Sequence, residues 1–183
     1  MKRVVRILCI FSFAIVYFSA VCGAAPAAVS PEDCRLCNTG NLQIGVVTSV
    51  QEASGVLGDV ISFAQGSPSS AYIPAKVVCE YGTIWLGDTS GNADTWTQAR
   101  VERLIVTRED VYTVGGVHIG DHLSKVIDTY GEARYRPNDI KEYNGVVDQW
   151  AKYSPASGLD HIAIGIRDGF VTAIAVSKMA GGL

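Results

Sequence analysis

The sequence predicts an α+β fold of two tandem helix–β–β–β repeats, with an antiparallel sheet and both helices on one face. Three observations support this prediction. A short helical signature occurs twice, three strand-like segments follow each copy, and the spacing between corresponding elements is nearly constant. Strands and helices have different side-chain periods, 2 and 3.6 residues, so the two patterns can be separated in the sequence.

The clearer helical signature is "GDHLSKVIDTYG", in which Asp121 is the predicted N-cap. Leu123, Val126 and Tyr130 follow at helical spacing and form one apolar stripe, and Gly131 supplies the stop. We therefore expect a helix of about two to three turns that begins at Asp121 and buries one face.

The same template fits 73 residues earlier, with Thr48 as the N-cap and Gly58 as the stop. Gln51 lies three residues after Thr48, which is the spacing of a capping box. The helix of the first copy is therefore expected to begin at Thr48. Its apolar positions are Val50, Ala53 and Leu57.

Three strand-like segments follow each predicted helix. In the second copy, isoleucine alternates with small residues over 162–166, and "RDG" at 167–169 predicts a hairpin turn. The small residues share the opposite sheet face, so we expect that face to lack a covering layer. The predicted strands are 75–82, 83–88, 100–107, 146–153, 160–169 and 170–177, and the small residues are Ala163, Gly165, Ala173 and Ala175.

Burial explains why two copies are needed. One helix on three strands is a unit of about 70 residues with a thin core, and two units can join their sheets edge to edge. The predicted organisation is a first repeat over 41–110, a second repeat over 111–178 and a short tail over 179–183.

The first residues predict export. Lys2, Arg3 and Arg6 precede an apolar run over 7–21, and small residues follow, which together indicate a signal peptide over 1–24. Lipidation at Cys22 and an uncleaved anchor are the alternatives. Residues 25–40 are rich in Ala, Pro and Ser and are expected to be a linker. The predicted location is the periplasm, the cell surface or the extracellular space.

Charge excludes some partners. Cleavage after residue 24 would remove three positive charges and no acid, which takes the net charge from −3 to −6. An acidic domain with dispersed charges is a poor ligand for nucleic acid, and membrane contact is expected only through an uncleaved or lipidated N-terminus.

Three cysteines follow the signal peptide: Cys34, Cys37 and Cys79. Because exported proteins meet oxidising conditions, a disulfide among them is the favoured interpretation. The spacing of Cys34 and Cys37 leaves a metal site or a redox pair as alternatives. No strand precedes the pair, and no second Cys pair is present for zinc.

No catalytic motif stands out, and neither a cofactor nor a metal site is expected. His118 and His122 are four apart, but His118 precedes the helix cap, so the two side chains should diverge. The mixed charges of 131–143 read as a solvated loop. Aromatic residues offer the better binding candidates, because Trp and Tyr are enriched in binding hot spots. The predicted binding residues are Trp85, Trp96, Trp150, Tyr153, His161 and Arg167, with core packing as the alternative for Trp150 and Tyr153.

The stretch "TVGGVHIGDHLSKVIDTYGEARY" resembles a module of small exported bacterial proteins, which often carry two copies. Its outline is matched at Gly116, Gly120, Asp121, Val126, Tyr130 and Gly131, whereas His122 replaces the common Ser and the first copy matches only loosely. The tandem plan is also similar to the β-lactamase inhibitor protein and to small lipoproteins of outer-membrane assembly. These resemblances imply a noncatalytic role in the cell envelope. We therefore expect binding of a protein or peptide through the open sheet face and the 87–97 hairpin, with a thiol or metal-binding protein as the alternative.

Overall fold

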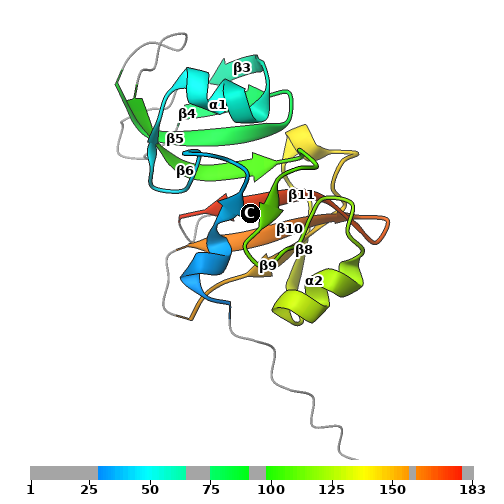
Figure 1. Cartoon of the computed structure of the whole chain (residues 1–183). Coiled ribbons are helices and arrows are strands. Elements are labelled where there is room, and N and C mark those ends of the chain that lie inside the picture. Colours follow the sequence, from blue (N-terminus) through cyan, green and yellow to red (C-terminus); the bar gives the residue numbers. More distant parts are fainter. Residues whose placement is uncertain (1–28, 65–74, 91–97, 157–159, 179–183) are drawn as a thin grey trace, which may run out of the picture.

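The computed structural model describes residues 29–64, 75–90, 98–156 and 160–178, and the predicted α+β class is confirmed (Figure 1). The described segments contain two α-helices and two 3-10 turns. They are α1 (Val50–Leu57), α2 (Leu123–Tyr130), η1 (Pro31–Cys34) and η2 (Lys141–Tyr143). The strands are β1 (Leu36–Cys37), β2 (Val47–Thr48), β3 (Val60–Ala64), β4 (Ala75–Cys79), β5 (Gly82–Ser90), β6 (Gln98–Val106), β7 (Tyr112–Thr113), β8 (Arg134–Pro137), β9 (Gln149–Tyr153), β10 (His161–Arg167) and β11 (Phe170–Ser177).

One nine-stranded sheet of antiparallel pairs forms the centre of the molecule, in the order β3-β4-β5-β6-β11-β10-β9-β8, with β2 paired to β6. The two runs of strands meet at β6 and β11, where Val106 pairs with Ile174. The hairpin between β10 and β11 turns at Asp168 and Gly169, whose positive φ angles of 51° and 82° suit a tight two-residue turn. The predicted "RDG" turn is therefore confirmed.

Each helix is followed by four strands, whereas the sequence predicted three. The additional strands, β3 and β8, form the two edges of the sheet. In β8, all residues are exposed and two are arginines, so its sequence has the character of the solvated loop that was predicted there. Because no position of β8 is buried, the apolar alternation by which strands are recognised is missing.

Both helices begin one residue later than predicted. Ser49, not Thr48, is the N-cap of α1, and its hydroxyl accepts a hydrogen bond from the Glu52 backbone N–H while Glu52 bonds back to the Ser49 N–H. Thr48 instead lies in β2, where it pairs with Ala99 of β6 and is buried. The glycine stops are confirmed, because Gly58 and Gly131 end the helices with φ angles of 78° and 79°.

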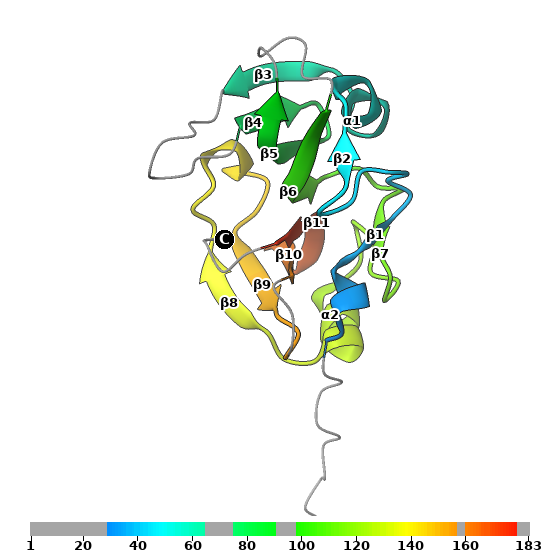
Figure 2. The same ribbon diagram turned by 90° about the vertical axis from the view of Figure 1, so that its left-hand side faces the viewer.

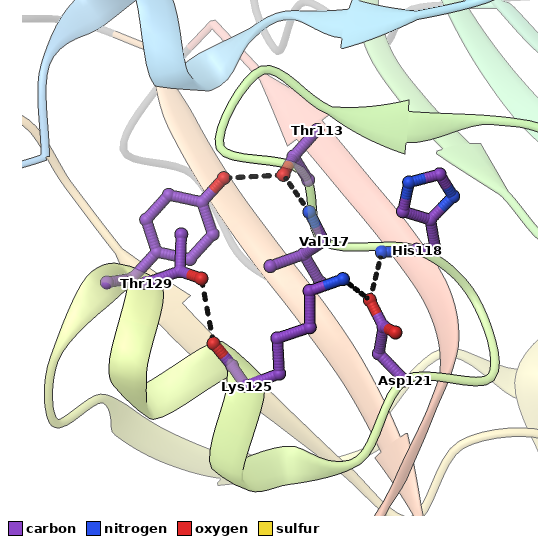
Figure 3. A network of polar contacts seen from close by, with 7 residues as sticks. Thr113, Val117, His118, Asp121, Lys125 and Thr129 are labelled. Carbon is purple, nitrogen blue, oxygen red and sulfur yellow. Dashed lines mark hydrogen bonds and ion pairs between the residues drawn. The ribbon is translucent and has the colours of Figure 1, made fainter.

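At the second helix, His122 is the N-cap, and its Nδ1 accepts a hydrogen bond from the Ser124 N–H at 3.2 Å. Asp121, the predicted cap, lies just outside the helix. Its carboxylate accepts from the backbone N–H of His118 at 2.6 Å and pairs with Lys125 Nζ at 2.8 Å (Figure 3). The neighbouring hydroxyl of Thr113 accepts from the Val117 N–H. Asp121 therefore fixes the loop that enters the helix.

The helices pack on one face of the sheet, with the short β1–β7 pair on the same side (Figure 2). The main hydrophobic core lies between these layers. It includes the apolar residues predicted for both helices, apart from Val50, whose side chain is not described, and Leu123, which is partly buried against it. The buried members are Ala53, Leu57, Ile84, Leu86, Val126, Tyr130, Ile162 and Ile164.

Part of the predicted linker is packed against this core. Ser30 caps the 3-10 turn η1, and β1 pairs with β7 through Leu36 and Thr113. Cys34 and Leu36 are 3% exposed and belong to the main core. Their apolar side chains face inward, so residues 29–40 form part of the fold.

The opposite sheet face, predicted to be open, is partly covered by residues 138–147, which we call the strap (yellow in Figure 2). Tyr143 and Val147 of the strap pack on Trp150 and on the small residues of β10 and β11. A Cβ atom added at Gly165 would lie 2.8 Å from Val147 Cγ2 and 3.1 Å from the Trp150 ring. The small residues therefore make room for the strap. The part of this face that the strap leaves uncovered lies beside Trp85.

Candidate functional site

A row of polar and aromatic side chains crosses the strap-bearing face where the strap does not cover it. Directly paired residues of antiparallel strands share a face. By this register, Lys76 of β4, Trp85 of β5, Arg103 of β6, Ser177 of β11 and His161 of β10 follow one another across the sheet. The row therefore crosses the junction between the two halves of the chain.

Trp85 makes two cation–π contacts, one with Lys76 and one with Arg103. The Lys76 Nζ atom is 5.3 Å from the centre of the indole ring, and the Arg103 guanidinium carbon is 5.0 Å from it. Trp85 is half-buried, because one side of its ring packs against the small core beneath the strap. Its neighbours in β5, Ile84 and Leu86, are buried on the opposite face, so Trp85 lies on the predicted binding face with partial exposure.

Two further cations extend this surface towards the edge of the sheet. Lys152 of β9 pairs with Ala163, and Arg136 of the edge strand β8 pairs with Trp150, so both lie on the strap-bearing face. Burial lowers the pKa of the Lys152 amine, and the positive charges of Arg136 and Arg103 lower it further. We call Lys76, Trp85, Arg103, Arg136 and Lys152 the basic patch.

The strap supplies carboxylates to the basic patch. Glu142 forms a salt bridge with Lys76 at 2.6 Å, and this contact holds the pKa of the Glu142 carboxyl below its ordinary value. Burial lowers the pKa of Arg103, whereas the negative charge of Asp139 raises it. Asp139 also raises the pKa of Lys152. The patch therefore already interacts with carboxylates from its own chain.

The other predicted binding residues are dispersed. Trp150 is fully buried and donates from Nε1 to Asn138 at 3.0 Å, and Tyr153 is buried on the helix-bearing face, where its hydroxyl donates to the Gly131 carbonyl. These two residues serve the core, as in the alternative interpretation. His161 contacts Ser154 at 2.6 Å near the patch, and Trp96 lies outside the described residues. Arg167 lies beside the turn of the β10–β11 hairpin, where its side chain is 3.6 Å from Asp168.

All three described cysteines are free thiols, so the predicted disulfide is not formed. Cys34 and Cys79 are buried in the main core, and their environment suits packing. Burial raises the pKa of the Cys34 thiol to about 12 and that of Cys79 to about 11. Because the thiolate is the reactive form, these two thiols are poorly suited to redox chemistry.

The two histidines of the α2 entry loop point to different partners. His118 stacks on Tyr112, with ring centres 4.5 Å apart, and His122 meets the edge of Phe170. In the part of the chain that the structure describes, no three His, Cys, Asp or Glu side chains are grouped as metal ligands would be.

Sequence reasoning missed the cations of the basic patch. Lys76 and Lys152 lie in strands between two buried residues, and Arg103 lies in a strand next to the buried Leu104. A charged residue at such a position signals an accessible sheet face. The strand register was needed to bring the three residues together, because they are far apart in sequence.

Comparison with known proteins gives no family, relative or fold neighbour, since no family model, curated protein or solved structure matches the chain. Among the described helices, none has the length and apolar character needed to cross a membrane.

Proposed function

We propose that this chain is a noncatalytic protein of the cell envelope that binds a protein or peptide partner through the strap-bearing face of its sheet. The single observation that carries the proposal is the position of Trp85, half-buried on that face between Lys76 and Arg103. A tryptophan in such a place combines a large apolar surface with polar neighbours that orient a ligand.

The fold supports a binding role in a second way. A sheet with helices on one face and a partial cover on the other leaves a rigid surface, and rigid surfaces lose little entropy on binding. The paired strands β4, β5 and β6 hold the three central residues of the basic patch in fixed register.

Export remains part of the proposal. Its support is the basic, apolar and small-residue order of residues 1–24, which lie outside the described residues. The intact mass of the protein recovered from the cell envelope tests it, because a cleaved signal peptide would shorten the chain by about the first 24 residues.

We further propose that the two halves are tandem copies of one unit, here a helix followed by four strands, as the resemblance to exported two-copy modules implies. The support is their matching plan. Both helices have eight residues and end at a glycine with positive φ, and the last strands of the two halves pair with each other.

Affinity capture from envelope extract tests the binding function. The full exported protein is immobilised, and the captured protein is compared with that obtained from Trp85→Ala. The matched control is Phe170→Ala, since Phe170 is another aromatic residue, 48% exposed at the hairpin turn and outside the basic patch. We expect Trp85→Ala to lose the partner and Phe170→Ala to retain it. Equal capture by both variants would contradict the proposal.

A further inference from the structure

We infer that the basic patch binds an acidic segment of the partner protein, in extended form. This inference rests on the proposed function and specifies the chemistry of the partner. The charges that surround Trp85, the strap carboxylates that already interact with them and the dimensions of the sheet support the inference.

The strap demonstrates which chemical group the patch accepts. Glu142 reaches from the second half of the chain to Lys76 in the first half and forms a 2.6 Å ion pair there. Asp139 acts on Arg103 and Lys152. Carboxylate groups from one short loop therefore already interact with three cations of the basic patch.

Towards β8 and β9, the repulsion of Lys152 by Arg136 exceeds its attraction to Asp139 of the strap. Arg136 is exposed, and Lys152 is half-buried with Arg103 and Arg136 near enough to disfavour its charged form. Bringing a further carboxylate to such a group offsets both its desolvation and the repulsion from its neighbours. An acidic ligand is thus favoured here, even though the chain as a whole has a net charge of −3.

The sheet geometry gives the length of the ligand. Lys76 and Lys152 lie on β4 and β9, which are five strand positions apart in the sheet order. At about 4.8 Å between neighbouring strands, the patch spans roughly 24 Å. An extended chain advances at most about 3.3–3.6 Å per residue, so about seven to eight residues cover this distance. The half-buried ring of Trp85 would contact an apolar side chain between the acidic ones.

Calorimetric titration of the full exported protein with three eight-residue peptides tests the inference. The peptides carry Glu, Gln or Lys at alternate positions around a central Leu. We expect the Glu peptide to bind, the Gln peptide to bind about tenfold more weakly or less, and the Lys peptide not to bind. Binding of the Glu peptide should weaken as salt is raised, because the contacts are exposed to solvent.

Two charge-removing variants locate the site. Lys152→Gln and Arg136→Gln should each weaken the Glu peptide by about two- to fivefold, which is the range for partly exposed ion pairs. The matched control is Lys125→Gln on α2, which removes the same charge from the helix side of the molecule and should leave binding unchanged. Circular dichroism of each variant verifies folding.

The results separate the two proposals. Equal binding of the Glu and Gln peptides, together with partner capture that depends on Trp85, would overturn the acidic-segment inference and leave the proposed function standing. A single-stranded oligonucleotide that binds the patch more tightly than the Glu peptide would also overturn it, since the ligand would then be a polyphosphate. Loss of both peptide binding and Trp85-dependent capture would overturn both proposals.

Discussion

The sequence predicted that Asp121 caps α2, but at the start of this helix Asp121 and His122 have separate roles. Asp121 binds the backbone of the preceding loop and Lys125, and His122 caps the helix. The Asp121 carboxylate accepts from the His118 N–H in the turn before the helix, and the Gly120 N–H joins this turn to β11 by donating to the Val171 carbonyl. This leaves the next residue to meet the free N–H groups of the first helical turn.

The cap predicts that His122→Ala destabilises the protein by about 1 kcal/mol, because the Ser124 N–H loses its acceptor. His122→Asn should retain most of this stability, since Asn is a good N-cap residue. Urea denaturation of the three proteins measures the difference. An alanine variant with an unchanged midpoint would show that the cap contributes nothing.

Asp121 predicts a dependence of stability on pH. Burial raises the pKa of its carboxyl, but hydrogen bonds from Lys125 and from the His118 backbone outweigh this effect and lower the pKa. Since the folded pKa lies below the unfolded value of about 3.9, the stabilisation is present above that pH and is lost as pH falls through the folded pKa.

Asp121→Asn is the matched comparison for this pH effect. The variant should be less stable than the natural protein at about pH 6, and the difference should shrink as the pH is lowered below about 4. Thermal unfolding at several pH values measures it. A difference that stays constant over this range would contradict the ionic role of Asp121.

At the scale of elements, the sequence predicted the strands with a buried face better than the strands at the edges. Alternating residues identify β4, β5, β10 and β11, because their buried positions are apolar. β8 has no buried position and β3 has little apolar burial, so periodicity fails for both. The helix starts were displaced by one residue because Thr48 and Ser49 are both good caps, and pairing of Thr48 with Ala99 decides between them.

The basic patch was beyond sequence reasoning for a related physical reason. Trp85 was found from its own character, whereas its cationic neighbours come from β4 and β6 and are brought together only by the register of the sheet. The small residues of β10 and β11 were recognised, but they were attributed to an open face. Their reason is close contact with the strap.

This contact predicts the effect of filling the space at Gly165. Gly165→Ala places a Cβ atom 2.8 Å from Val147 Cγ2, so we expect a loss of about 1–3 kcal/mol of unfolding free energy from overpacking. The matched control is Gly55→Ala, which lies in α1 with open space around it and should stabilise by about 0.5–1 kcal/mol. Chemical denaturation measures both. A neutral Gly165→Ala would mean that the strap does not pack on β10.

At the scale of the whole molecule, the two halves are joined on both sheet faces. β6 pairs with β11 in the middle of the sheet, and the main core includes both helices. On the other face, the Tyr143 hydroxyl donates to Thr83 Oγ1 at 3.1 Å, and Glu142 pairs with Lys76. The strap thus belongs to the second half by sequence and contacts the first half in space.

The contacts between the two halves predict one cooperative unfolding transition. Differential scanning calorimetry should give a calorimetric enthalpy equal to the van't Hoff enthalpy, since the main core contains residues of both halves. Tyr143→Phe should lower the midpoint of that one transition, because it leaves Thr83 without its buried partner. Two resolved transitions would show instead that the halves fold independently.

The unequal edges of the sheet determine how the protein behaves at high concentration. β8 carries Arg134, Arg136 and Pro137, which repel or block an approaching strand, whereas β3 has no charged residue and Ile61 is 69% exposed. Aggregation should therefore start at β3, although the bulge beside Ile61 makes this edge less regular. Ile61→Lys is expected to raise the concentration at which light scattering first appears, while Tyr135→Lys on β8 should change it little. The uncharged edge is therefore expected to limit the solubility of the protein.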